Sequence, residues 1–203
     1  MFYNIIKVLA FFILKLFFFI EAKGRKNIPK DGGLLVISNH CSQMDPVIIG
    51  AVFPRRLYYM GKEELFKIPF LRSLIVSLGA FPVKRGEGDL KALSRIIELV
   101  DQGKAVLLFP EGSRSEDGEL KDFMHGASYV AFKTSVPVLP VAVKGSFEAM
   151  PKGQYFPRPT KIKVSFGKVL YFKGRGGKSI REEIKAFTND LRENILMLLK
   201  GEI

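Results

Sequence analysis

Cysteine and histidine are scarce in this 203-residue chain, which contains one of the first and two of the second. The single Cys41 excludes an internal disulfide and a multi-cysteine metal cluster, and it fits a reducing compartment. So few sulfur and imidazole ligands offer no convincing zinc site, and we predict that the protein binds no metal. The Gly-x-Ser-x-Gly pattern of a serine hydrolase is also absent.

Acidic residues are too few to balance the basic ones: 20 Asp and Glu stand against 32 Lys and Arg, which gives a net charge of +12. A surplus of this size suits nucleic acid, an anionic membrane or an acidic protein partner. No nucleic-acid-binding motif accompanies the charge, so we expect no nucleic-acid partner. Hydrophobic residues make up 47% of the chain, which at this length indicates one folded domain.

The first twenty residues are apolar and rich in phenylalanine. No small-x-small cleavage site follows them, which argues against a signal peptide. A helix crossing the bilayer would bury Lys15 in hydrocarbon, whereas in a helix lying on the bilayer Asn4, Lys7 and Lys15 share one polar stripe. We therefore predict a membrane-associating helix over residues 1–24, lying on the surface rather than spanning it. A helix that covers the protein's own core or contacts an oligomer partner is the alternative.

Beyond residue 24, short apolar runs alternate with helical patterns. This alternation predicts a single α/β domain over residues 25–203, with a mainly parallel mixed sheet flanked by helices. Residues 162–166 and 168–172 are predicted to form one bent strand or a hairpin. The other predicted strands are 33–38, 57–60, 80–84, 105–109 and 138–143, and the predicted helices are 47–52, 70–78, 89–101, 126–134 and 179–199.

A histidine and an aspartate flank the turn after the first of these strands. His40 follows the strand at the carboxyl edge of the sheet, and Asp45 opens the next helix, so the turn can bring them into contact. The carboxylate would then orient the imidazole, whose free nitrogen could take a proton from an alcohol. His-x4-Asp alone is a common spacing, and a structural histidine is the alternative. Adjacent side chains point opposite ways, so we do not assign Cys41 as a nucleophile.

Four short blocks make this pair specific: NHCSQMD (39–45), GAFPVKR (79–85), FPEGSRS (109–115) and VPVLPVAV (136–143). In this order the chain resembles the lysophosphatidic acid acyltransferases (1-acylglycerol-3-phosphate acyltransferases) over about residues 25–200. The resemblance implies that His40 is the catalytic base and Asp45 its partner, and that the second and third blocks bind the acceptor and its phosphate. The matching positions are Arg85, Glu111, Gly112, Ser113 and Arg114, with Lys62 as a further candidate.

Two positions depart from the usual pattern of that family. Ser113 stands where a threonine is usual, which keeps the hydroxyl. Residues 123–126 read Phe-Met-His-Gly instead of Phe-Lys-x-Gly, which removes a cation near the acceptor blocks. His125 has no acidic neighbour in motif position, so we expect a surface or structural role for it. Glu111 could hold an arginine or lysine in position.

The resemblance implies transfer of a fatty acyl group from acyl carrier protein or coenzyme A to the free hydroxyl of 1-acylglycerol-3-phosphate. The product would be phosphatidic acid, formed in phospholipid biosynthesis without a covalent acyl-enzyme, a metal or a redox cofactor. We expect a monotopic or peripheral enzyme on the cytoplasmic side of the cell membrane. The alternatives are an acyltransferase for another lysolipid or for glycerol 3-phosphate, a thioesterase in which His40 activates water, and a non-catalytic lipid-binding protein.

Overall fold

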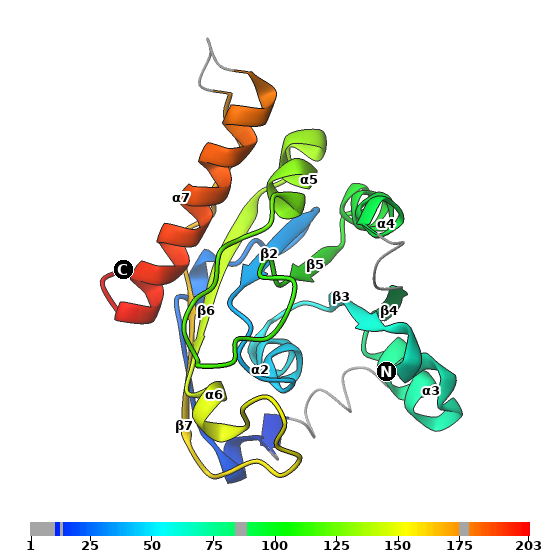
Figure 1. Cartoon of the computed structure of the whole chain (residues 1–203), viewed down its shortest axis with the longest axis vertical. Coiled ribbons are helices and arrows are strands. Elements are labelled where there is room, and N and C mark those ends of the chain that lie inside the picture. The colour runs from blue at the N-terminus through cyan, green and yellow to red at the C-terminus, as the bar shows by residue number, and fades with distance from the viewer. Residues whose placement is uncertain (1–10, 13, 84–88, 175–178) are drawn as a thin grey trace.

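A seven-stranded sheet forms the centre of the computed structural model, which describes residues 11–12, 14–83, 89–174 and 179–203 (Figure 1). Its strand order is β1-β7-β6-β2-β5-β3-β4. Strands β6, β2, β5, β3 and β4 run parallel to one another, whereas β7 is antiparallel to β6, and β1 is parallel to β7. The strands are β1 (Phe19–Lys23), β2 (Leu34–Ser38), β3 (Leu57–Lys62), β4 (Ala80–Val83), β5 (Ala105–Leu108), β6 (Val138–Lys144) and β7 (Lys161–Phe166). The mixed, mainly parallel sheet is the one predicted.

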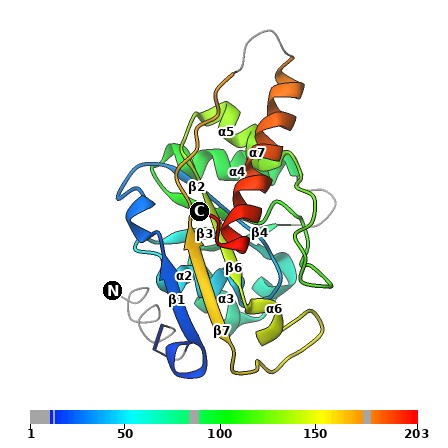
Figure 2. The same ribbon diagram turned by 90° about the vertical axis from the view of Figure 1, so that its left-hand side faces the viewer.

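Helices cover both faces of this sheet (Figures 1 and 2). Side chains alternate along β2, so Leu34 and Val36 pack in one core cluster with α2, whereas Leu35 and Ile37 pack in another with α4, α5 and α7. Cover on both faces explains why every residue of β2 and β5 is buried. The helices are α2 (Asp45–Val52), α3 (Pro69–Ser77), α4 (Asp89–Asp101), α5 (Gly126–Thr134), α6 (Ser146–Ala149) and α7 (Ile180–Lys200), with 3-10 helices η1 (Arg25–Asn27) and η2 (Glu63–Lys67).

The helix predicted over residues 1–24 is wrong at its carboxyl end. Residues 14–17 are helical, but residues 19–23 form β1, whose backbone pairs with β7. Pairing with β1 satisfies the backbone N–H and C=O groups along the outer edge of β7, and Phe18 is buried in the core beside β1. Residues 1–10 and 13 lie outside the described part of the chain. Among the residues described, no helix is both long enough and apolar enough to cross a bilayer.

The second difference from prediction concerns residues 168–172. Residues 162–166 belong to β7, but the segment after them forms neither a bent extension nor a hairpin. It makes a single antiparallel bridge, between Leu170 and Val138 at the start of β6. The other predicted strands and helices are present with ends shifted by no more than two residues.

Candidate active site

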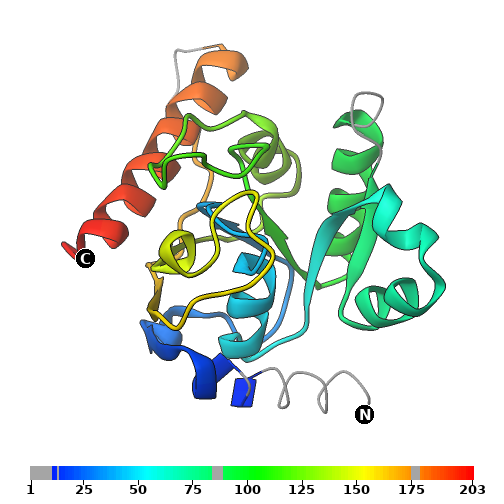
Figure 3. The same ribbon diagram turned by 60° about the horizontal axis from the view of Figure 1, so that its bottom comes forward.

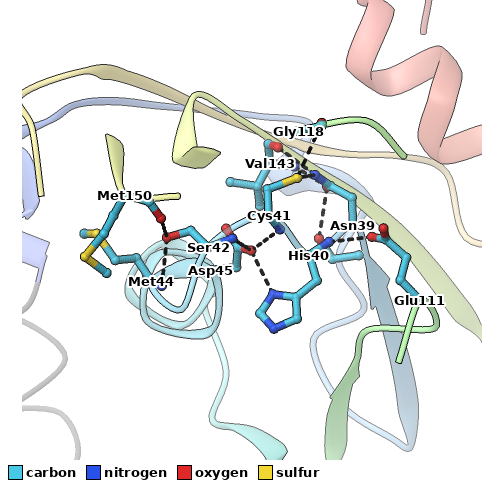
Figure 4. A network of polar contacts seen from close by, with 11 residues as sticks. Asn39, His40, Cys41, Ser42, Met44, Asp45, Glu111, Gly118, Val143 and Met150 are labelled. Carbon is cyan, nitrogen blue, oxygen red and sulfur yellow. Dashed lines mark hydrogen bonds and ion pairs between the residues drawn. The ribbon is translucent and has the colours of Figure 1, made fainter. Parts of the chain in front are cut away.

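Two loops meet at the carboxyl edge of the sheet, because β2 and β5 are parallel neighbours. The loop after β2 carries residues 39–45, and the loop after β5 carries residues 109–115. His40 joins them through its backbone: its N–H donates to Glu111 Oε1 at 2.6 Å, and its carbonyl accepts from the Ser115 N–H at 2.7 Å. The first and third sequence blocks therefore form one site, part of which is drawn in Figure 4.

The predicted contact between the histidine and the aspartate is present. His40 Nδ1 lies 2.9 Å from Asp45 Oδ2. The Asp45 carboxylate is fully buried, and the same oxygen accepts the N–H groups of Cys41 and Ser42, each at 2.8 Å. These backbone donors fix the carboxylate before any substrate binds. A carboxylate in this place keeps the proton on Nδ1 and leaves Nε2 as an acceptor.

The imidazole of His40 is held flat against a neighbouring ring. It stacks on Phe109, with ring centroids 4.0 Å apart and an interplanar angle of 20°. Its side chain is 19% exposed. Nε2 points away from Asp45, and no described residue forms a hydrogen bond with it (Figure 4). The ring is therefore fixed on one side and open to a reactant on the other.

Glu111 is buried, and its carboxylate binds backbone rather than a basic side chain. Oε1 accepts the His40 N–H, and Oε2 accepts the Lys121 N–H at 3.1 Å. Burial raises the pKa of Glu111, and the two amide hydrogen bonds partly oppose that rise. Glu111 thus holds a lysine, Lys121, through its backbone N–H and not through an ion pair, and it fastens two loop backbones to each other.

Asn39 has a structural role that the sequence reading missed. Its side-chain amide donates to the Val143 carbonyl at 2.9 Å and accepts the Val143 N–H at 2.8 Å. The side chain thus continues the pairing of β2 with β6 beyond the last strand residue, just before His40. A buried asparagine directly after an apolar strand needs hydrogen-bond partners, so a structural role for Asn39 could have been predicted from its position in the sequence.

Cys41 is buried next to the aspartate. Burial, reinforced by the negative charge of Asp45, raises the pKa of Cys41 to about 12. The thiol is therefore protonated at neutral pH, which agrees with leaving Cys41 out of the chemistry.

The third sequence block (109–115) carries a hydroxyl that is hydrogen-bonded to a lysine. Lys121 Nζ donates to Ser113 Oγ at 2.7 Å, and none of the ion pairs among the described residues includes Lys121. Arg114 is partly exposed and makes no hydrogen bond or ion pair within the described part of the chain. Both cations are therefore available to an anion. Lys121 was missed, although it stands only three residues before the position where the usual lysine is absent.

Met124, which stands in place of that lysine, lies against Gly112. The Gly112 φ of 71° favours glycine, and a Cβ there would lie 2.7 Å from Met124 Sδ. Met124, at the position of the usual lysine, therefore lies over the backbone of the acceptor block while remaining 53% exposed. A side chain at residue 124 reaches this block, but in this protein it brings no charge.

The remaining predicted site residues are less closely placed. Lys62 is exposed at the end of β3, a strand that β5 separates from β2. Within the described part of the chain its side chain has no hydrogen bond to the loops after β2 and β5. Arg85 lies outside the described residues. His125 is structural, as predicted: its Nδ1 lies 3.2 Å from Thr188 Oγ1 on α7.

The sheet and the two joined loops define a class of protein. The model of the acyltransferase family matches residues 19–144, more than half of the chain. The chain therefore belongs to the acyltransferase family, and the resemblance drawn from the four blocks is confirmed. The matched region starts at the first residue of β1, so this strand is part of the acyltransferase domain.

The chain is also similar to individual acyltransferases from several organisms. The chloroplastic 1-acyl-sn-glycerol-3-phosphate acyltransferase BAT2 of Brassica napus is 34% identical over 140 residues, which cover 68% of this chain and 40% of that protein. This chain thus spans well under half of that relative's length. The 1-acyl-sn-glycerol-3-phosphate acyltransferase of Bacillus subtilis (strain 168) is 29% identical over 178 residues, covering 87% and 86% of the two chains. The crystal structure of the 1-acyl-sn-glycerophosphate (LPA) acyltransferase PlsC from Thermotoga maritima superposes with a TM-score of 0.78 at 29% identity, covering 97% of this chain and 79% of PlsC.

Proposed function

We propose that this protein transfers a fatty acyl group from an acyl thioester to the free hydroxyl of 1-acylglycerol-3-phosphate, forming phosphatidic acid in phospholipid biosynthesis. The observation that carries the proposal is an imidazole bonded to a buried carboxylate at Nδ1 and open at Nε2, beside a loop with two available cations. The names of the relatives support the choice of acceptor.

His40 acts as the general base in this reaction. Nε2 takes the proton of the acceptor hydroxyl while the oxygen attacks the thioester carbonyl, and Asp45 stabilises the imidazolium that forms. As the carbon–sulfur bond breaks, the imidazolium returns the proton to the leaving thiolate. Base catalysis of this kind contributes about 10²–10⁴-fold. The acyl group passes directly to the acceptor, because the neighbouring Cys41 is a buried, protonated thiol.

The loop after β5 binds the acceptor phosphate. A phosphate monoester is close to a dianion, and the planar guanidinium of Arg114 can donate two hydrogen bonds to its oxygens. Lys121, held at the Ser113 hydroxyl, supplies the second cation in place of the lysine that residue 124 lacks. Lys62, at the end of β3, and Arg85, in the second sequence block, are further candidates for phosphate contacts.

The acyl donor is a thioester of acyl carrier protein or of coenzyme A. Both donors are anionic, and the net charge of +12 suits either of them. The reaction as written balances without a metal or a redox cofactor.

The enzyme works at the cytoplasmic side of the cell membrane and rests on the bilayer through its apolar N-terminal segment. In the described part of that segment Phe12, Leu16 and Phe17 are exposed, and so is Phe19 at the start of β1. Exposed apolar side chains so close together favour contact with lipid.

Products formed by purified protein in detergent test this proposal. The acceptors are 1-acylglycerol-3-phosphate, other lysolipids and glycerol 3-phosphate, each offered with both thioester donors. Phosphatidic acid from the first acceptor, and its loss in H40A, is the expected result. Fatty acid released without any acceptor would identify a thioesterase, and lipid binding without any product would identify a lipid-binding protein.

A further inference from the structure

Two groups of exposed aromatic side chains, far apart in the sequence, lie at the same end of the molecule. Phe19 opens β1 and is in register with Lys161, the first residue of β7. The segment that leads into β7 carries Tyr155 and Phe156, which are 85% and 86% exposed. In Figures 1 and 2 this segment (yellow) and the N-terminal segment (blue) both lie at the bottom of the molecule.

This end of the molecule is also the edge that carries the candidate active site. Strand β6 is parallel to β2, and β7 is antiparallel to β6. The starts of β7 and β1 therefore lie at the edge where β2 ends and His40 follows. Figure 3 brings this edge forward, with the 150–160 segment in front.

The segment between α6 and β7 is fastened at its base and free at its tip. The Met150 carbonyl accepts the Ser42 hydroxyl at 2.8 Å, which ties the base to the turn between His40 and Asp45. The Arg158 N–H donates to the Ala149 carbonyl at 2.8 Å, closing the segment into a loop. Lys152 forms an ion pair with Glu116 in the loop after β5. The two aromatic side chains at the tip nevertheless remain almost wholly exposed to solvent.

We propose that the Tyr155–Phe156 tip enters the membrane interface and, with Phe17 and Phe19, forms a lipid-contact surface that turns the active-site edge toward the bilayer. This inference rests on the proposed function, in which the acceptor is a lipid. Tyrosine and phenylalanine bury their rings at the level of the headgroups. The exposed Arg158 next to the tip, and the net charge of +12, favour an anionic lipid surface.

A bilayer fits this surface better than an acidic carrier protein. A carrier protein would be recognised mainly through charge, whereas the tip offers two exposed rings next to each other in the sequence, and Phe17 and Phe19 are exposed at the same end of the molecule. Burying these rings in lipid removes their apolar area from water, which an acidic protein surface would achieve only in part.

The chain contains no tryptophan, so one introduced indole reports on its own surroundings. In F156W, adding vesicles of phosphatidylcholine with phosphatidylglycerol should shift the emission to the blue, and brominated lipids should quench it. Y171W is the matched control, because Tyr171 is 56% exposed and follows Leu170, which bridges Val138 at the opposite edge of the sheet. Its emission should not change.

A binding and activity assay tests the same surface without a probe. In Y155S/F156S the fraction of protein sedimenting with the vesicles should fall at least about tenfold, because two rings that would be buried in lipid are lost. Acylation of vesicle-embedded lysophosphatidic acid should fall in parallel, whereas acylation of a dispersed short-chain acceptor should stay within about twofold. Y171S should match the unaltered protein in all three measurements.

Each other outcome overturns the inference. Unchanged F156W emission with vesicles, or Y155S/F156S sedimenting like the unaltered protein, rules out lipid contact by the tip. A blue shift that requires acyl carrier protein and not vesicles assigns the tip to the donor instead. Failure of the proposed function is distinct, because the unaltered protein would then acylate no lysolipid, embedded or dispersed.

Discussion

The histidine and the two cations of the candidate site differ in how firmly the surrounding residues hold them. In the loop after β2, Asp45 Oδ2 accepts three hydrogen bonds, and both backbone polar groups of His40 have partners. In the loop after β5, Arg114 makes no bond among the described residues, and the ammonium of Lys121 meets only the Ser113 hydroxyl. The imidazole is thus positioned in advance, whereas the cations stay available for a ligand. Altering the groups that hold His40 should lower turnover, and altering the two cations should weaken acceptor binding.

Asp45→Asn should produce the largest effect. The amide preserves the shape but removes the charge that orients His40 and stabilises its imidazolium, so we expect kcat to fall by about 10²–10⁴-fold. Steady-state kinetics measures this fall, and circular dichroism establishes that the variant is folded. Full turnover in a folded D45N would mean that the aspartate has no part in the reaction.

Glu111→Gln should produce the next largest effect and sharpen the comparison. The amide can accept only one of the two backbone N–H groups, which loosens the His40 backbone without touching an acceptor. We expect kcat to fall by roughly tenfold, the value of one hydrogen bond to a charged group, with little change in KM for the acceptor. An increase confined to KM would place Glu111 at the acceptor instead.

Lys121→Met should act on binding. Losing one cation from the phosphate contact should raise KM for lysophosphatidic acid by about tenfold and leave kcat nearly unchanged. In the K121M background, M124K should restore most of the affinity by returning a lysine to the usual position. K133M, which changes an exposed lysine near the end of α5, serves as the control. An unchanged KM in K121M would remove this residue from the phosphate site.

Cys41→Ala should have the smallest effect. We expect transfer to stay within about threefold, because the buried thiol next to His40 contributes only packing and two long sulfur hydrogen bonds, with Asn39 and Gly118. With the pKa raised to about 12, the fraction of thiolate at pH 8 is negligible, so iodoacetamide should label the folded protein slowly and the urea-unfolded protein quickly. Loss of activity on rapid labelling of the folded protein would contradict this prediction.

Local patterns predicted the parts of the protein whose interactions are local. The apolar runs of β2 and β5 predicted buried strands, and the five-residue separation of His40 and Asp45 predicted their contact. Asn39 could not be assigned in the same way, because its partner Val143 is 104 residues away.

Strand β1 shows the limit most clearly. It directly follows a phenylalanine-rich segment that resembles an apolar helix, and only its pairing with β7, about 140 positions further along the chain, makes it a strand. Glu111 and Lys121 are a milder case: the blocks marked their neighbourhood, but the direction of each side chain depended on how the two loops fold onto each other.

The pairing of β1 with β7 also limits how the protein can be shortened. Removing residues 1–24 as a detachable tail would strip the outer strand from the sheet and leave the hydrogen-bonding groups of β7 exposed to solvent. An unpaired strand edge can pair with strands of other molecules, so the shortened protein should self-associate even though its most apolar segment has been removed. Cutting before Phe11 instead would retain the strand, and with it Leu14 and Phe18, which pack beneath the sheet.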